Sequence, residues 1–290
     1  MLRESVDLLD LQDGDIVVDA TAGSGGHSEA ILKEAHVSLI ALDADPQAVE
    51  RTHARLQKLG SRAKDARVIE GNFGDIDALL SEHHGREVTK VLFDLGWNIE
   101  QLASGRGFSF AHNEPLDMRY GERAASGFTA AEVLNTWSET AIADALFGYG
   151  EERYARRIAK AVVERREVAP VNTTLEFVEI IRDSVPALYR HGRINPATRS
   201  FQALRIAVND ELGVLSRGIE GAWKHLAKEG RIAVITFHSI EDRVVKRAFA
   251  ELVAKGEGKL LSKKPLTASE EEITTNRPSR SAKLRGIQKI

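Results

Sequence analysis

The sequence predicts an α/β protein with a mostly parallel, doubly wound sheet and an all-helical insertion. Strand-like and helix-like segments alternate through the first hundred residues. This alternation is typical of a parallel sheet whose connecting helices cover both faces. The strand pattern disappears over residues 105–207 and returns afterwards. We therefore expect a discontinuous sheet domain, residues 1–104 and 208–290, that contains a helical domain, residues 105–207.

Five runs of β-branched and apolar residues are expected to form the strands. The runs in the first hundred residues end in, or soon meet, a polar residue or a glycine, and folds of this kind bind ligands at the carboxyl ends of their strands. A helix is expected between successive strands, and Pro46 suits the first turn of one of them. The runs are Ile16–Asp19, Ser38–Asp43, Arg67–Glu70, Lys90–Asp94 and Arg231–Phe237.

The remaining segments give weaker signals. Thr173 and Glu176 have the spacing of a capping box, which predicts a helix start. Pro196 is expected to open a helix whose apolar stripe continues to Leu215. Gly230 is interpreted as the end of a helix. The basic, polar tail over residues 255–290 is expected to be irregular.

Composition excludes several classes of protein. The 290 residues include no cysteine, which excludes disulfides, thiolate catalysis and cysteine-ligated metals. His83 and His84 lack the spacing of metal ligands, so no metal is expected. No apolar run has the length of a membrane span and no secretion signal is present, so we expect a cytoplasmic protein without a membrane partner. A net charge of −3 argues against a generally basic nucleic-acid binder but leaves local basic patches open.

A glycine-rich turn follows the first expected strand. Gly23, Gly25 and Gly26 would let a ligand approach the backbone closely, just after Asp19. The spacing departs from the dinucleotide fingerprint because Ser28 takes the place of the last glycine. Alone, this pattern also fits a tight turn without a ligand.

Residues at the other strand ends narrow the ligand to an adenosyl cofactor. Asp43 could accept both hydrogen bonds of a ribose diol, and Phe73 could flank an adenine. Asp94 ends the fourth strand, next to the expected reacting centre, and Asp19 could orient a methionine moiety. NAD would also suit Asp43, but no second motif for hydride transfer is present. The set favours S-adenosylmethionine and methyl transfer, which mainly requires alignment of an electron-rich atom with the activated methyl group.

The whole chain from about residue 10 closely resembles the bacterial 16S ribosomal RNA (cytosine-N4)-methyltransferase family. The resemblance rests on many separate blocks and therefore is highly specific. These blocks are Asp19–Ser28, Gly105–Phe110, Pro115–Arg119, Tyr149–Arg153, Pro196–Arg199, Phe201–Arg205, Phe237–Arg243 and Arg280–Arg285.

The resemblance implies a Rossmann-like class I methyltransferase fold and methylation of the exocyclic amine of cytidine 1402 in the small ribosomal subunit. It implies cofactor contacts from Gly25, Gly26, His27, Asp43, Phe73, Asp94 and Gln101. Gln101 rests on the resemblance alone.

The expected reaction is a direct, metal-free transfer to cytosine N4. That nitrogen is a poor nucleophile because its lone pair is delocalised, so a carboxylate that accepts one of its protons would help. Asp94 is the first candidate for this role and Asp117 the second. Trp97 could stack on an unstacked target base, although a packing role is the more plausible interpretation of this residue.

Basic and polar side chains are candidates for RNA contact. The family blocks contribute Arg119, Arg199, His238 and Ser239 to this set. A helix with Arg153, Arg156, Arg157 and Lys160 on one face, and the tail from Lys263 to Arg285, are further candidates, with a merely solvated charged face as the alternative. His238 and Ser239 could also suggest a nucleophilic dyad, but no third group supports acyl chemistry.

Two departures from the family keep another function open. Family members usually begin with a His-x-Pro-Val-Leu-Leu segment, whereas this chain starts at Met1-Leu2-Arg3-Glu4. The family's Asp-Leu-Gly-x-Ser-Ser loop reads Asp94-Leu95-Gly96-Trp97-Asn98-Ile99. A catalytically impaired RNA-binding or ribosome-assembly paralogue is therefore the alternative function, and a homodimer is left open.

Overall fold

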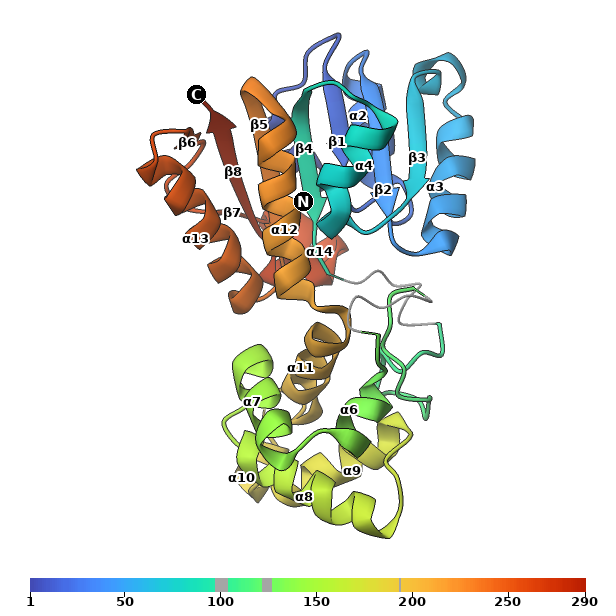
Figure 1. The fold of residues 1–290 in the computed structure, drawn as a ribbon, viewed down its shortest axis with the longest axis vertical. Helices are drawn as coiled ribbons and strands as arrows, with labels where there is room; N and C mark the ends of the chain where they lie inside the picture. The colour runs from blue at the N-terminus through green and yellow to red at the C-terminus, as the bar shows by residue number, and fades with distance from the viewer. Residues whose placement is uncertain (97–103, 122–126, 193) are drawn as a thin grey trace. The chain divides into compact units, whose positions relative to one another are not determined.

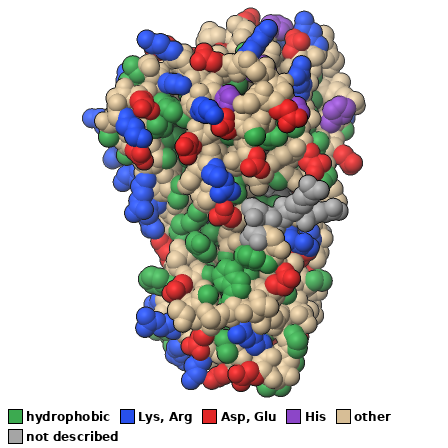
Figure 2. Space-filling view, in the orientation of Figure 1, with side chains coloured by type: hydrophobic (Ala, Val, Ile, Leu, Met, Phe, Trp, Pro, Cys, Tyr) green, Lys and Arg blue, Asp and Glu red, His purple; other side chains and the backbone are tan. Residues whose placement is uncertain are grey.

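The computed structural model describes residues 1–96, 104–121, 127–192 and 194–290 (Figure 1). The chain divides into two compact units. Met1–Gly96 and Leu212–Ile290 form the sheet unit, and Trp97–Glu211 form the helical unit. None of the described helices combines the length and apolarity needed to cross a membrane. Acidic and basic side chains are interspersed over the visible face of each unit (Figure 2).

The sheet unit contains eight described strands in the order β3-β2-β1-β4-β5-β8-β6, with β7 paired to β8. β1 to β5 are parallel neighbours, whereas β8 is antiparallel to β5. The predicted α/β class with a mostly parallel sheet is therefore confirmed. The strands are β1 (Ile16–Asp19), β2 (Ser38–Asp43), β3 (Ala66–Glu70), β4 (Val88–Asp94), β5 (Leu226–Thr236), β6 (Gly258–Leu260), β7 (Leu266–Thr267) and β8 (Lys283–Lys289).

Helices cover both faces of this sheet. Successive strand residues alternate between the faces, so Val17 belongs to one core cluster and Val18 to the other. α4, α12 and α13 pack on the Val18 face, and Figure 1 shows α4 and α12 in front of the strands. α1, α2 and α3 pack on the Val17 face. The helices of this unit are α1 (Leu2–Leu9), α2 (Gly26–Glu34), α3 (Pro46–Gln57), α4 (Ile76–His83), α12 (Glu211–His225), α13 (Ser239–Ala254) and α14 (Glu270–Thr275).

The structure corrects the prediction of an irregular tail. Residues 258–289 supply three strands, and β8 pairs along its length with β5. In β8 the buried Leu284 alternates with the partly exposed Lys283 and Arg285. The basic residues lie on the opposite face of the strand from Leu284 and pair with Asp242 of α13, so the segment reads as polar in sequence although it forms a strand.

The prediction that Gly230 ends a helix is wrong, because α12 already ends at His225. Gly230 lies in β5, where the register shifts between Val88 and Lys90 of the neighbouring strand. A Cβ at this position would lie 2.8 Å from the Ala227 carbonyl oxygen, so the irregularity requires a glycine.

The described part of the helical unit contains helices and no strand; a single isolated bridge joins Pro115 and Thr173. The predicted capping box at Thr173 and Glu176 is present at the start of α9. The helix expected to run from Pro196 to Leu215 is instead broken at Asp210, which has the left-handed φ of 47° that aspartate tolerates. The helices are α6 (Ala130–Thr136), α7 (Glu139–Gly150), α8 (Ala155–Val168), α9 (Thr174–Ser184), α10 (Ala187–Arg190) and α11 (Ala197–Asn209).

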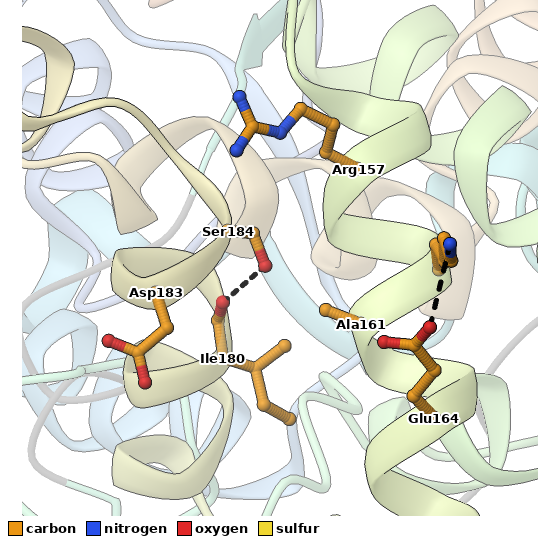
Figure 3. A pocket seen from close by; sticks show the side chains of 7 residues that line it. Arg157, Ala161, Glu164, Ile180, Asp183 and Ser184 are labelled. Carbon is orange, nitrogen blue, oxygen red and sulfur yellow. Dashed lines mark hydrogen bonds and ion pairs between the residues drawn. The ribbon is translucent and has the colours of Figure 1, made fainter.

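These helices enclose a core of their own. It includes Leu134 of α6, Ile158 of α8, Phe177 of α9 and Leu204 of α11, all fully buried. Between α8 and α9 the surface forms a hollow of about 510 Å³, which Figure 3 shows with Arg157 and Glu164 on one side and Asp183 on the other.

Candidate active site

Three aspartates lie at the carboxyl ends of three adjacent parallel strands. Asp19 ends β1, Asp43 ends β2 and Asp94 ends β4, and β1 lies between the other two strands. Parallel neighbours end at the same edge of a sheet, so the predicted site residues share that edge. The structure thus places the three carboxylates where a doubly wound sheet binds its ligand.

The glycine-rich turn between β1 and α2 is held by Asp19. This side chain is fully buried, accepts a 2.6 Å hydrogen bond from the Ser28 hydroxyl and lies 3.3 Å from the Thr21 amide. Burial raises its pKa. Both carboxylate oxygens therefore serve the turn itself, and the predicted contact of Asp19 with a methionine moiety remains a prediction.

The turn has the backbone that only glycine adopts easily. Gly23 has a φ of 56° and Gly25 a φ of 80°. A Cβ on Gly23 would meet nothing closer than 4.0 Å, whereas one on Gly25 would lie 3.3 Å from the backbone of Thr52. Gly23 thus has open space beside its backbone, and Gly25 allows α3 to approach the turn.

Two residues of α3 support the same turn from behind. The Thr52 hydroxyl donates to the Gly23 carbonyl oxygen at 3.2 Å, and Arg55 donates to the Ser24 carbonyl oxygen at 2.9 Å. Arg55 also pairs with Glu29 of α2 at 2.5 Å. Sequence reasoning missed Thr52 and Arg55 because they lie about thirty residues from the turn, and no local pattern marks them.

Asp43 links the turn to the end of β2. One carboxylate oxygen accepts from the Gly23 amide at 2.7 Å and the other from the Asp45 amide at 2.9 Å. Burial raises the pKa of Asp43. Each carboxylate oxygen has two acceptor positions, so a second position on each oxygen is left for a ligand diol.

Asp94 and His27 form a close polar pair at the edge of the sheet. His27 Nδ1 lies 3.4 Å from Asp94 Oδ2. Burial raises the pKa of Asp94 to about 7 and lowers the pKa of His27. The Asp94 amide donates to the Thr21 hydroxyl at 2.7 Å, which ties the end of β4 to the glycine-rich turn.

The Asp94–His27 pair also contains two buried polar atoms without a hydrogen-bond partner among the described residues. These atoms are Asp94 Oδ1 and His27 Nε2. Such atoms are costly unless a ligand or water satisfies them. These two atoms, the second acceptor positions on the Asp43 oxygens and the open space beside Gly23 fit an adenosyl cofactor, which carries a ribose diol and a positively charged sulfur.

Phe73 begins a short 3-10 helix that follows β3. Its ring packs edge-on against Phe93 with a centroid distance of 5.6 Å, and a Cβ on Gly218 of α12 would lie 2.7 Å from it. These contacts place Phe73 against the sheet, and its predicted contact with adenine remains a prediction.

His238 and Ser239 start α13, directly after β5. His238 Nδ1 accepts from the Glu241 amide at 3.3 Å, and Nε2 lies 3.0 Å from Glu241 Oε1. The imidazole therefore forms part of a capping box. This arrangement gives His238 a structural role at a helix start, and RNA contact by His238 and Ser239 remains a prediction.

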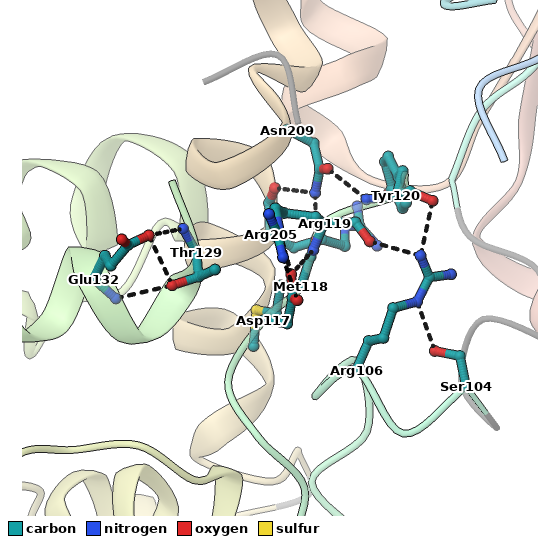
Figure 4. Close-up of polar contacts among 10 residues, drawn as sticks. All are labelled: Ser104, Arg106, Asp117, Met118, Arg119, Tyr120, Thr129, Glu132, Arg205 and Asn209. Atoms are coloured by element: carbon teal, nitrogen blue, oxygen red, sulfur yellow. Dashed lines mark hydrogen bonds and ion pairs between the residues drawn. The ribbon is translucent and has the colours of Figure 1, made fainter. Parts of the chain in front are cut away.

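Asp117, the second candidate for proton acceptance, belongs to the helical unit and is paired with Arg119. Two hydrogen bonds of 2.6 and 2.8 Å join the guanidinium to the carboxylate, and Figure 4 shows the pair among its neighbours. The pair holds the pKa of Asp117 below its ordinary value. A carboxylate of low pKa is a weak base, so Asp94 is better suited to accept a proton.

The other predicted residues of the helical unit also have local partners. Arg153 lies over the rings of Tyr154 and Tyr189, and Arg199 donates to the Glu151 carbonyl oxygen at 3.2 Å. Trp97 and Gln101, predicted to stack on the base and to bind the cofactor, lie outside the described residues. Their roles remain predictions.

Comparison with known proteins places the chain in a family. The sequence matches the MraW methylase family over residues 1–290. It is 45% identical to a protein named "Ribosomal RNA small subunit methyltransferase H" from Synechocystis sp., covering 98% of this chain and 90% of that protein. Proteins of the same name from Persephonella marina and Treponema denticola are 43% and 42% identical, covering 96% and 100% of this chain and 93% and 96% of those proteins.

The match to a methylase family favours methyl transfer over the NAD-dependent hydride transfer that Asp43 alone would also allow. The predicted cofactor, S-adenosylmethionine, and the predicted methyl transfer are confirmed at the level of the family. The glycine-rich turn, the three aspartates and the full-length match lead to the same result. The chain belongs to the MraW methylase family of S-adenosylmethionine-dependent methyltransferases.

Proposed function

We propose that this protein methylates the N4 amine of cytidine 1402 in 16S ribosomal RNA of the small ribosomal subunit. The names of relatives that are 41–45% identical support the RNA substrate. The sequence blocks shared with the cytosine-N4 methyltransferases support the nucleotide and the atom. The site supports the chemistry, and the observation that carries it is the position and pKa of Asp94.

Asp94 has the properties of a proton acceptor for an amine. It ends β4 beside the glycine-rich turn, and its pKa of about 7 makes it a stronger base than an ordinary aspartate. Cytosine N4 needs such a base because its lone pair is delocalised into the ring. In the proposed reaction, the N4–carbon bond forms as the carbon–sulfur bond breaks, sulfur keeps that electron pair, and Asp94 takes the N4 proton.

The sheet unit holds the cofactor in this proposal. Asp43 accepts hydrogen bonds from the ribose hydroxyl groups, Gly23 leaves open space for the cofactor beside its backbone, and Asp19 and the close packing of Gly25 against α3 keep the turn in shape. His27 stays neutral at pH 7 because burial lowers its pKa, and it orients the Asp94 carboxylate from 3.4 Å. When bound, S-adenosylmethionine supplies a methyl group activated by its positively charged sulfur.

The helical unit is proposed to recognise the RNA. Its arginines, including Arg119, Arg153 and Arg199, are the candidates for phosphate and base contact, together with His238 and Ser239 of the sheet unit. The target base must leave its stack before N4 can be aligned with the methyl group.

One assay tests this function against its alternative. Purified protein, radiolabelled S-adenosylmethionine and small subunits from a strain that lacks the modification are incubated, and the labelled nucleoside is identified by digestion and mass spectrometry. Label on N4 of cytidine 1402 is the expected result. Cofactor and subunit binding without label would instead support the catalytically impaired assembly factor. Label on another nucleotide would overturn the proposed target.

A further inference from the structure

The helical unit contains a groove between α7 and the start of α8. The groove has a volume of about 350 Å³, which is in the size range of ligand sites. Phe147 of α7 contributes an aromatic ring, and Arg153, Arg156 and Arg157 contribute three guanidinium groups. Asp144 is the one carboxylate among the residues that line it.

The charge of this groove is not neutralised by the protein. In the described part of the chain, none of the three guanidinium groups has a carboxylate or hydrogen-bond partner. Three arginines against one aspartate leave the lining with a net charge of +2. The first turn of α8 also has no acidic residue, and its N-cap residue Tyr154 supplies no side-chain cap. An anion would therefore be stabilised in the groove by charges that currently face water.

Aromatic rings lie beside two of these arginines: the Arg157 guanidinium lies 5.9 Å from the centre of the Tyr154 ring, and Arg153 is held more closely. The Arg153 guanidinium lies 4.9 Å from the centre of the Tyr154 ring and 4.6 Å from that of Tyr189. The Tyr189 hydroxyl donates at 2.6 Å to the fully buried Glu152, which fixes the ring. A guanidinium stacked in this way keeps its edge donors available and has less freedom to lose on binding.

Phe147 is exposed to an unusual degree for its type. Its side chain is 66% exposed, although it follows Leu146, which is fully buried. Proteins that bind single-stranded nucleic acids combine an exposed aromatic ring with unpaired arginines in this way. The bases stack on the ring, and the phosphates contact the guanidinium groups.

The hollow on the other side of α8 gives a useful contrast. Arg157 and Lys160 line it together with Glu164 and Asp183, so its charges balance (Figure 3). Lys160 also lies 3.6 Å from Glu164. Arg157 lines both hollows, but only the α7–α8 groove combines excess positive charge with an exposed aromatic ring.

We propose that the α7–α8 groove binds a single-stranded segment of the RNA substrate outside the target nucleotide. One base stacks on Phe147, and the adjoining phosphates contact Arg156 and Arg157, while Arg153 on its tyrosine rings completes the cationic wall. This inference rests on the proposed function for the identity of the RNA. Its role is to anchor the substrate and not to take part in methyl transfer.

The test uses two variants of the full-length protein, Phe147→Ala and Arg156→Glu/Arg157→Glu. Binding of a fluorescent single-stranded RNA of about 12 nucleotides is followed over about 50 to 300 mM salt. We expect Phe147→Ala to weaken binding about tenfold, which corresponds to the loss of one stacked base. The double variant should weaken binding more and lower the slope of log K against log salt by about 1 to 2. On small subunits, both variants should raise KM and leave kcat and S-adenosylmethionine affinity near those of the wild type.

Matched controls come from the same unit. Leu188→Ala removes another exposed apolar side chain. Arg182→Glu reverses the charge at an exposed position that lines neither hollow. Because Phe147, Arg156 and Arg157 are exposed, none of these variants should change the unfolding temperature appreciably. The controls should bind RNA within about twofold of the wild type, because neither residue lines the groove.

The outcomes separate this inference from the proposed function. If the wild type binds the oligonucleotide through the groove but does not methylate the subunit, the proposed function fails and the groove stands as an RNA site. If the groove variants bind RNA and show KM like the controls, the inference is overturned while methylation stands. If Phe147→Ala changes the sedimentation of the protein and not its RNA binding, the groove is a protein interface and the inference is also overturned.

Discussion

Replacing Asp94 by asparagine is expected to stabilise the folded protein at neutral and higher pH while it abolishes methyl transfer. The pKa of Asp94 rises from its ordinary value of 3.8 to about 7, with burial as the main cause. Below pH 3.8 the carboxyl is protonated in both the folded and unfolded states and does not affect their balance. Above that pH the unfolded chain releases the proton first, so the free energy of unfolding falls until the pH passes about 7.

The magnitude follows from the difference between the two pKa values. Full linkage gives a cost of at most about 4 kcal/mol at pH 8 and less than about 2 kcal/mol at pH 5. Because the side chain is 29% exposed, solvent screening should reduce these values by about half. Asparagine resembles the protonated carboxyl and removes the cost, so Asp94→Asn should raise the free energy of unfolding by about 2 kcal/mol at pH 8 and by little at pH 4.

Urea unfolding of the cofactor-free protein at a series of pH values measures this difference. Asp117→Asn is the control with the opposite sign, since Arg119 lowers the pKa of Asp117. Its pairing stabilises the fold above the unfolded pKa and is lost as the pH falls, so this variant should be less stable at pH 8 by about 1 kcal/mol. A pH-independent effect of Asp94→Asn, or normal turnover with intact cofactor binding, would refute the role given to Asp94.

Three further changes test other parts of the structure. Asp43→Ala should weaken S-adenosylmethionine binding at least about tenfold in calorimetry, because it removes the diol acceptor and leaves the Gly23 amide without a partner; unchanged affinity would remove Asp43 from the site. Gly150→Ala should destabilise the protein by about 3 kcal/mol, because the added Cβ would lie 2.4 Å from the Arg199 carbonyl oxygen, whereas Gly148→Ala in the same helix has open space and should be neutral or stabilising; equal denaturation midpoints for the two would contradict this packing. Asp242→Ala should cost about 3 kcal/mol and speed hydrogen exchange in β8, because it leaves Lys283 and Arg285 without their shared carboxylate; unaltered protection of β8 would show that the strand does not depend on this contact.

The sequence predicted the central strands because their signal is local. Ile16–Asp19 and Ser38–Asp43 are short β-branched runs, each buried on both faces and each ending in an aspartate. Neighbouring parallel strands end at one edge, so the order of the chain was enough to bring Asp19, Asp43 and Asp94 together.

The errors occur where structure depends on distant partners. β8 lies beside β5, but its Lys283 and Arg285 are paired with Asp242 of α13, about forty residues away in sequence, and without that partner they read as a polar tail. The break at Asp210 is supported by Asn209, whose amide donates to the Met118 carbonyl oxygen, a contact that no periodicity reveals. Likewise, the partial protonation of Asp94 depends on its burial, which a motif does not report.

The alignment of Asp19, Asp43 and Asp94 on one edge of the sheet also affects how the cofactor is exchanged. Acidic groups gathered in a shielded site create a negative potential. A sulfonium ion is attracted by that potential, whereas the thioether that remains after transfer is uncharged at sulfur and feels no such attraction. The same edge should therefore retain the methyl donor better than the spent product, and this preference should weaken as the pH falls through the pKa of Asp94, near 7. On this view, strand register contributes to limiting product inhibition as well as to binding.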